Sequence, residues 1–169
     1  MCHSLPHRER HAPVTGAVVI GIGNEFRRDD GIGPAVAAEL SVRALPGVRV
    51  LTCAAEPTAL LDAWAGATRA VLVDAAAGDE PGRVRTCGLD ELTEACPVSS
   101  HDLGLRQAFE LGRALGRAPG SVVVVTVDVA DTGHGQGLSP AVRAALPEAV
   151  RAVQRVVLAA GEERAHQQP

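Results

Sequence analysis

From residue 17 onward, short apolar runs alternate with longer stretches in which apolar and polar residues are mixed. The mixed stretches predict helices over residues 31–45, 57–66, 99–116 and 138–160. Residues 83–89 alternate in polarity, which favours an edge strand. The apolar runs predict strands over residues 17–23, 48–53, 69–75 and 121–129, and the last of these is expected to be central.

The order of these elements predicts the fold class. Strands that alternate with helices indicate an α/β three-layer sandwich, with a mainly parallel sheet of about five strands and helices on both faces. Pro34 suits a first helical turn, Ser99 or Ser100 suits an N-cap, and Pro147 is expected to kink the last helix. We expect one domain over residues 17–160, a disordered N-terminal extension over 1–16 and a flexible C-terminal tail over 161–169.

Composition narrows the function classes. Aromatic residues make up only 2% of the 169 residues, which disfavours binding of single-stranded nucleic acid by stacking. The net charge is −4 and the arginines are scattered, so neither a nucleic-acid nor a membrane surface is expected. The start of the chain has no apolar signal-peptide region, and Cys2, Cys53, Cys87 and Cys96 form no C-x-x-C pair. We therefore expect reduced thiols and a cytoplasmic location.

Three polar groups fall near predicted strand ends, where parallel α/β sheets bind their ligands. Asp29 and Asp30 follow the first strand, Asp74 ends the third, and His101 begins the helix after a Ser-rich loop. Neighbouring residues point in different directions, so we expect only one of the first two to face the others. Asp30 is the candidate because it lies closer to the helix start.

Two carboxylates and an imidazole allow two kinds of chemistry. They supply oxygen and nitrogen ligands to a divalent metal and leave positions open for a substrate. A carboxylate pair that shares one proton would instead suit an aspartic-type acid and base. The histidine favours the metal. Each residue also has an ordinary structural interpretation, as a helix cap, a turn former or a solvated surface group. Dinucleotide binding is disfavoured, because the third glycine of G-x-G-x-x-G would have to stand at Phe26.

Four segments together resemble the hydrogenase maturation proteases, over roughly residues 17–158. The resemblance implies an endopeptidase that removes the C-terminal extension of a nickel-loaded [NiFe]-hydrogenase large-subunit precursor. It also implies that Asp30, Asp74 and His101 are the catalytic and metal-site residues, which recognise nickel carried by the substrate. Another divalent metal would bind there only adventitiously, and a monomer is expected. The segments are GIGNEFRRDDGIG (21–33), VDA (73–75), SSHDLGL (99–105) and GLSP (137–140).

Two positions depart from the family pattern and concern substrate choice. Many relatives have Gly-Gly-Thr where this chain has Ala-Glu-Pro-Thr (55–58), and Gly or Glu is more usual where it has Val-Asp (127–128). Asn24, Glu56 and Thr58 are the expected substrate-binding residues. Asn24 could equally hold its loop, and Thr58 could cap its helix. The alternative function is a non-catalytic metal-recognition or chaperone module for hydrogenase assembly. A small-molecule metallohydrolase or nucleotide-binding protein is the least favoured alternative.

Overall fold

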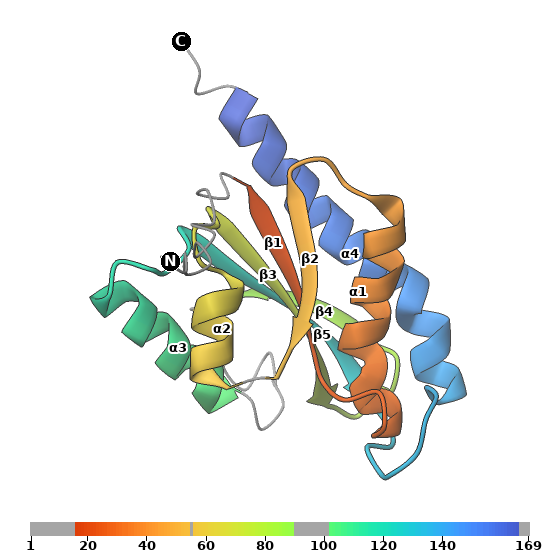
Figure 1. Ribbon diagram of the computed structural model, residues 1–169. Helices are drawn as coiled ribbons and strands as arrows, with labels where there is room; N and C mark the ends of the chain where they lie inside the picture. The colour runs from red at the N-terminus through yellow and green to blue at the C-terminus, as the bar shows by residue number, and fades with distance from the viewer. Residues whose placement is uncertain (1–15, 55, 90–101, 166–169) are drawn as a thin grey trace, which may run out of the picture.

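The computed structural model describes residues 16–54, 56–89 and 102–165. Within these residues, a five-stranded sheet is covered by helices on both faces (Figure 1). The strands are β1 (Ala17–Ile22), β2 (Val48–Cys53), β3 (Arg69–Ala77), β4 (Val84–Gly88) and β5 (Ser121–Val129). The helices are η1, a 3-10 turn (Arg28–Gly31), α1 (Ile32–Arg43), α2 (Pro57–Ala63), α3 (Asp102–Ala114) and α4 (Pro140–Ala165).

The strand order is β2-β1-β3-β5-β4, and every neighbouring pair is parallel except β4 with β5. The α/β prediction with a mainly parallel sheet is therefore confirmed, and β4 is the expected edge strand. The prediction that residues 121–129 form the central strand needs correction, because β3 occupies the middle of the sheet. β5 lies one place further out and is covered on its outer side by the antiparallel strand β4.

Two apolar cores lie on opposite faces of the sheet. One contains Val36 of α1 and Val153 of α4, packed against Val71 and its neighbours on the sheet. The other contains Leu60 of α2 and Ala108 of α3, together with sheet residues of the opposite face. Successive strand residues point to opposite faces, so burial on both sides explains the nearly continuous apolar runs in the sequence.

Most predicted boundaries agree with the structure to within a few residues. The bounds of β2 and β5 match the prediction, whereas β3 continues to Ala77 and α4 runs from Pro140 to Ala165. The predicted N-caps at Ser99 and Ser100, and most of the predicted N-terminal extension, lie outside the described residues. No helix in the described segments is both long enough and apolar enough to span a membrane.

The cysteines differ from the expectation of reduced thiols. Cys53, at the end of β2, is a free thiol, and burial raises its pKa to about 11. Cys87 on β4 is buried and disulfide-bonded. Because spacing along the chain does not reveal which sulfurs meet in space, cysteine counting could not detect this bond.

Helix α1 begins very close to the backbone of β1 and β3. A Cβ atom on Gly33 would overlap the carbonyl oxygen of Ile22 and would lie 2.6 Å from that of Val73. Only a residue without a side chain lets the helix approach the sheet this closely. This contact fixes the position of η1, which precedes α1 and carries the two adjacent aspartates.

Candidate functional site

Asp30 follows β1 along the chain, and Asp74 lies in β3 at the level where β1 ends. Gly21 of β1 pairs with Val73 of β3, so Asp74 lies one residue beyond this pair. On the β1 side, a Cβ atom on Gly23 would lie 3.6 Å from the carboxyl carbon of Asp30. Both carboxylates therefore lie close to the point where β1 ends, and Asp74 is three residues short of the end of β3.

Both aspartates are largely buried and their orientations are fixed by the backbone. Asp30 is 8% exposed, and its Oδ2 accepts a hydrogen bond of 2.9 Å from the backbone N–H of Asn24. Asp74 is 1% exposed, and its Oδ1 accepts one of 2.9 Å from the N–H of Ala75. Buried carboxylates at strand ends are not ordinary surface groups, and they favour a cation as their partner.

The third predicted residue, His101, lies outside the described residues, directly before the first residue of α3. Among the side chains that the structure describes, no group of three or more His, Cys, Asp or Glu residues is arranged to hold a metal ion. The two aspartates offer carboxylate oxygens, and their role as metal ligands, like that of the imidazole, remains a prediction.

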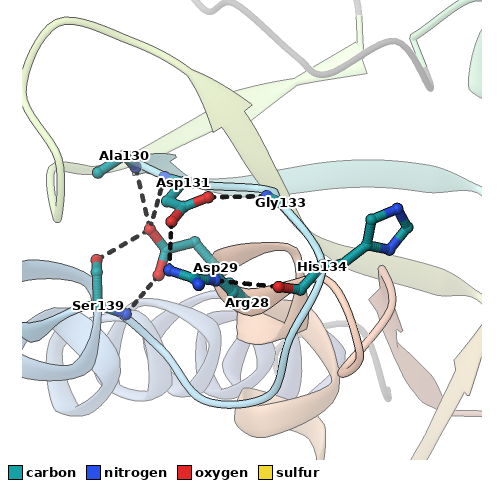
Figure 2. Close-up of polar contacts among 7 residues, drawn as sticks. All are labelled: Arg28, Asp29, Ala130, Asp131, Gly133, His134 and Ser139. Atoms are coloured by element: carbon teal, nitrogen blue, oxygen red, sulfur yellow. Dashed lines mark hydrogen bonds and ion pairs between the residues drawn. The ribbon is translucent and has the colours of Figure 1, made fainter.

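Asp29 has a different partner from its neighbour Asp30. Its fully buried carboxylate points into the loop between β5 and α4, as Figure 2 shows. Oδ2 accepts hydrogen bonds from the N–H groups of Ala130 (3.1 Å) and Asp131 (3.0 Å), and Ser139 donates its N–H to Oδ1 (2.6 Å) and its hydroxyl to Oδ2 (2.9 Å). The two adjacent aspartates therefore serve separate roles, and sequence reasoning missed that of Asp29. The sequence feature that could have indicated this role is the GLSP segment (137–140), because it contains the hydrogen-bond donor Ser139.

These hydrogen bonds determine the charge of Asp29. Burial alone would raise its pKa, but the bonds from Ser139 and from the N–H groups of Asp131 and Ala130 outweigh that effect and lower it. Hydrogen bonds donated to the ionised form stabilise it, so Asp29 stays charged at neutral pH. The carboxylate acts as an anchor that holds the loop before α4 against η1.

Backbone contacts strengthen the same junction. Arg28 N–H donates to the carbonyl of Gly135 (2.9 Å), and Gly135 N–H donates to that of Phe26 (2.9 Å). The Arg28 guanidinium pairs with Asp131 (2.7 Å), whereas the ring of His134 points away from this cluster (Figure 2). A cavity of about 340 Å³ opens at this junction and is lined in part by Arg28 and Arg143. The edge of the sheet is thus held by contacts between two loops that are distant in sequence.

The three predicted substrate-binding residues are all exposed. Asn24 Oδ1 accepts a 2.9 Å hydrogen bond from Phe26 N–H, so this residue does hold its loop, one of its two expected roles. Glu56 is the N-cap residue of α2 and makes no side-chain capping bond. Thr58 lies inside the first turn of α2, so the cap position belongs to Glu56. Contact with a substrate remains a prediction for all three.

Buried polar residues continue along β5 beyond this edge. Thr126 and Asp128 are both fully buried, and Asp128 forms an ion pair with Arg85 of β4. A Cβ atom on Gly78 would overlap the Asp128 carboxylate, so the chain leaving β3 passes directly over this side chain. Asp128, one of the residues that depart from the family pattern, therefore forms an ion pair that joins β4 to β5.

The fold and the two buried carboxylates describe a small α/β protein with a candidate ligand site beside the carboxyl end of β1. A sequence profile described as hydrogenase maturation protease matches residues 34–156, a span that includes Asp74 and His101 and begins four residues after Asp30. The chain belongs to the hydrogenase maturation protease family. It is accordingly a peptidase of hydrogenase maturation.

Solved structures of the same kind share the fold. The hydrogenase maturating endopeptidase HybD from E. coli is 24% identical, with a TM-score of 0.74 over 87% of this chain and 94% of that one. The [NiFe] hydrogenase maturation protease HybD from Thermococcus kodakarensis is 25% identical, with a TM-score of 0.72 over 85% and 99%. HycI from Thermococcus kodakarensis KOD1 is 27% identical, with 0.61 over 85% and 90%. No curated protein gives a significant match.

Proposed function

We propose that this peptidase removes the C-terminal extension of a [NiFe]-hydrogenase large-subunit precursor after nickel has been inserted. In this proposal Asp30, Asp74 and His101 recognise the nickel that the precursor carries. The observation that supports it most strongly is the position of the two buried carboxylates beside the carboxyl end of β1. Two of the solved relatives are themselves named [NiFe] hydrogenase maturation proteases.

The charge of this edge favours a cation that arrives with the substrate. Two buried carboxylates at one edge of a sheet repel each other, and a divalent cation between them replaces that repulsion by attraction. Carboxylate oxygen and imidazole nitrogen are both suitable ligands for nickel. Since the precursor delivers the metal, the peptidase needs no resident cofactor, and another divalent ion at the same place would be adventitious.

The residues of this chain would contribute orientation and a base. The N–H groups of Asn24 and Ala75 fix one oxygen of Asp30 and of Asp74, respectively. Each carboxylate then directs its remaining lone pairs toward the substrate. One of the two acts as general base toward the water that attacks the nearby peptide bond. Recognition of the metal thus positions the bond to be cleaved.

The exposed residues around the edge would select the precursor. Asn24 lies in the loop after β1, and Glu56 and Thr58 lie at the start of α2, after β2. Substrate peptide that passes over the ends of these strands meets all three side chains. The proposal also includes a monomeric protein in the cytoplasm, where the precursor is assembled.

The experiment incubates the purified peptidase with a nickel-loaded precursor and follows the mass of the large subunit. We expect the unmodified peptidase to shorten the subunit at its C-terminus, and Asp30→Asn, Asp74→Asn and His101→Ala to abolish the change. Asp79→Asn is the matched control, because Asp79 is exposed in the loop between β3 and β4. Nickel-free precursor should stay uncut. Unimpaired processing by the three site variants would exclude this assignment of the site.

The same experiment distinguishes a peptidase from a chaperone-like module. A module that only recognises nickel would bind the precursor, and binding would be lost in the site variants, yet the mass of the large subunit would never change. That outcome would contradict the proposed cleavage while leaving metal recognition intact.

A further inference from the structure

A row of polar residues crosses the sheet at the level of Asp74. Asp74 of β3 is the register partner of Thr126 of β5, and Thr126 is the partner of Arg85 of β4. Residues that face each other on neighbouring strands project to the same side of a sheet. That side is the one covered by α2 and α3, because Leu72 and Val124, each two residues earlier in its strand, belong to that core.

Thr126 is the unusual member of this row. Its side chain is completely buried, and its hydroxyl has no hydrogen-bond partner among the described residues. The four residues that precede it in β5 (122–125) are all valine, which has the same shape as threonine but lacks the hydroxyl. Buried hydroxyl groups in native proteins are nearly always hydrogen-bonded, so an unpartnered one calls for a specific explanation.

Thr126 has two charged neighbours in this row, and only one of them, the carboxylate, carries a hydrogen-bond acceptor. The guanidinium of Arg85 pairs with the carboxylate of Asp128, which is held beneath Gly78. Asp74 is the other neighbour, and a carboxylate oxygen can accept a hydroxyl hydrogen bond while another of its lone pairs faces a cation. The Thr126 hydroxyl therefore lies beside the one carboxylate in the row that belongs to the candidate site.

We propose that Thr126 is a positioning residue for Asp74, an inference that rests on the proposed function. When a nickel-loaded precursor is bound, the Thr126 hydroxyl donates a hydrogen bond to the Asp74 carboxylate and holds it in the orientation that meets the metal. Carboxylates that contact metals are themselves usually hydrogen-bonded, and loss of such a partner reduces metal affinity or activity about 10- to 100-fold. In the free protein Asp74 accepts a hydrogen bond from Ala75 N–H, and the Thr126 hydroxyl has no partner among the described residues.

The test compares Thr126→Val with Thr126→Ser. Valine keeps the shape and removes the hydroxyl, so we expect unchanged or higher resistance to urea, together with processing and binding of the nickel-loaded precursor reduced about 10- to 100-fold. Serine keeps the hydroxyl and should restore most of both. Binding of nickel-free precursor should be the same in all forms. Thr86→Val, a matched change at an exposed position of β4, should have no effect.

Three results would overturn the inference. These are wild-type processing by Thr126→Val, an equal defect in Thr126→Ser, or a loss of stability in Thr126→Val that accounts for its lower activity. Asp74→Asn separates this inference from the proposed function. If Asp74→Asn is inactive while Thr126→Val is fully active, only the positioning role is wrong. If Asp74→Asn also processes normally, the proposed site itself is wrong.

Discussion

Asp29 accepts two hydrogen bonds from Ser139, one from its N–H group and one from its hydroxyl, although the two residues are 110 positions apart. This contact joins the turn before α1 to the residue that precedes α4. It also leaves the adjacent Asp30 free to point toward the end of β1. The different orientations of the two neighbouring aspartates thus depend on a contact between segments that are distant in sequence.

Replacing Asp29 by Asn should destabilise the protein. The carboxylate is fully buried and receives four hydrogen bonds, whereas an amide would bring an N–H₂ group against N–H donors. We expect a loss of about 2–3 kcal/mol in the free energy of unfolding, measured with urea at neutral pH. Asp131→Asn is the control, since its ion pair with Arg28 is exposed and should be worth less than about 1 kcal/mol. Equal losses in the two variants would contradict the anchoring role.

The contribution of Asp29 should also depend on pH in a defined direction. Its pKa is lowered in the folded protein, so its stabilising effect is complete above the unfolded pKa of about 4 and is lost as the pH falls through the folded value. The difference in unfolding free energy between wild type and Asp29→Asn should therefore shrink in acid and stay constant from about pH 5 to 7. Urea unfolding of both proteins across this range measures it.

Glu148 is a second acid with a lowered pKa, and its effect on stability must be distinguished from that of Asp29. Hydrogen bonds from Arg151 and Arg155 also lower the pKa of Glu148, but this side chain lies on the surface of α4. Its interactions should be screened by added salt, whereas those of the buried Asp29 should be screened much less. A difference between the two proteins that grows on acidification, or that vanishes in high salt, would be inconsistent with the assignment to Asp29.

The sequence predicts the fold well where burial leaves a local pattern. The bounds of β5 and the fold class follow from apolar runs, because strands covered on both faces need apolar residues at successive positions. The adjacent aspartates could also be placed directly after β1, whereas Asp74, predicted to end its strand, lies three residues before the end of β3. Strand bounds and the positions of residues next to a strand can be predicted because they depend only on the residues of one segment and on the rule that parallel sheets bind ligands at their carboxyl edge.

Other features depend on register and on contacts across the chain, which no local pattern contains. The partner of Asp29 required knowledge that the loop before α4 folds back onto η1. The pairing of Thr126 with Asp74 required the order of the strands, and the expectation of a central β5 shows that this order was not readable from apolar content. The bonded state of Cys87 likewise depends on the meeting of distant segments.

Gly33→Ala should damage both stability and activity. The added methyl group would overlap backbone atoms of β1 and β3, neither of which can rotate away, so α1 would have to move. We expect a loss of about 2–3 kcal/mol in urea unfolding. Processing of the precursor should also slow, because Asp30 lies in η1, which leads directly into this helix. Gly116→Ala is the comparison: Gly116 has a φ of +64° but open space around it, so the cost should be about 1 kcal/mol, with normal processing. Normal processing and stability in Gly33→Ala would show that the close approach is not needed.

The buried ion pair between Arg85 and Asp128 should respond unequally to removal of its two partners. The Asp128 side chain is fully enclosed, whereas the Arg85 side chain is 19% exposed and can reach water when its partner is neutral. Arg85→Met therefore leaves a buried charge without a partner and should cost about 3–5 kcal/mol in urea unfolding. Asp128→Asn leaves only the partly exposed guanidinium and should cost less. Arg117→Met removes the exposed pair with Asp62 and should cost below about 1 kcal/mol. If Arg85→Met were no more harmful than Arg117→Met, the pair would not be what ties β4 to the edge of the sheet.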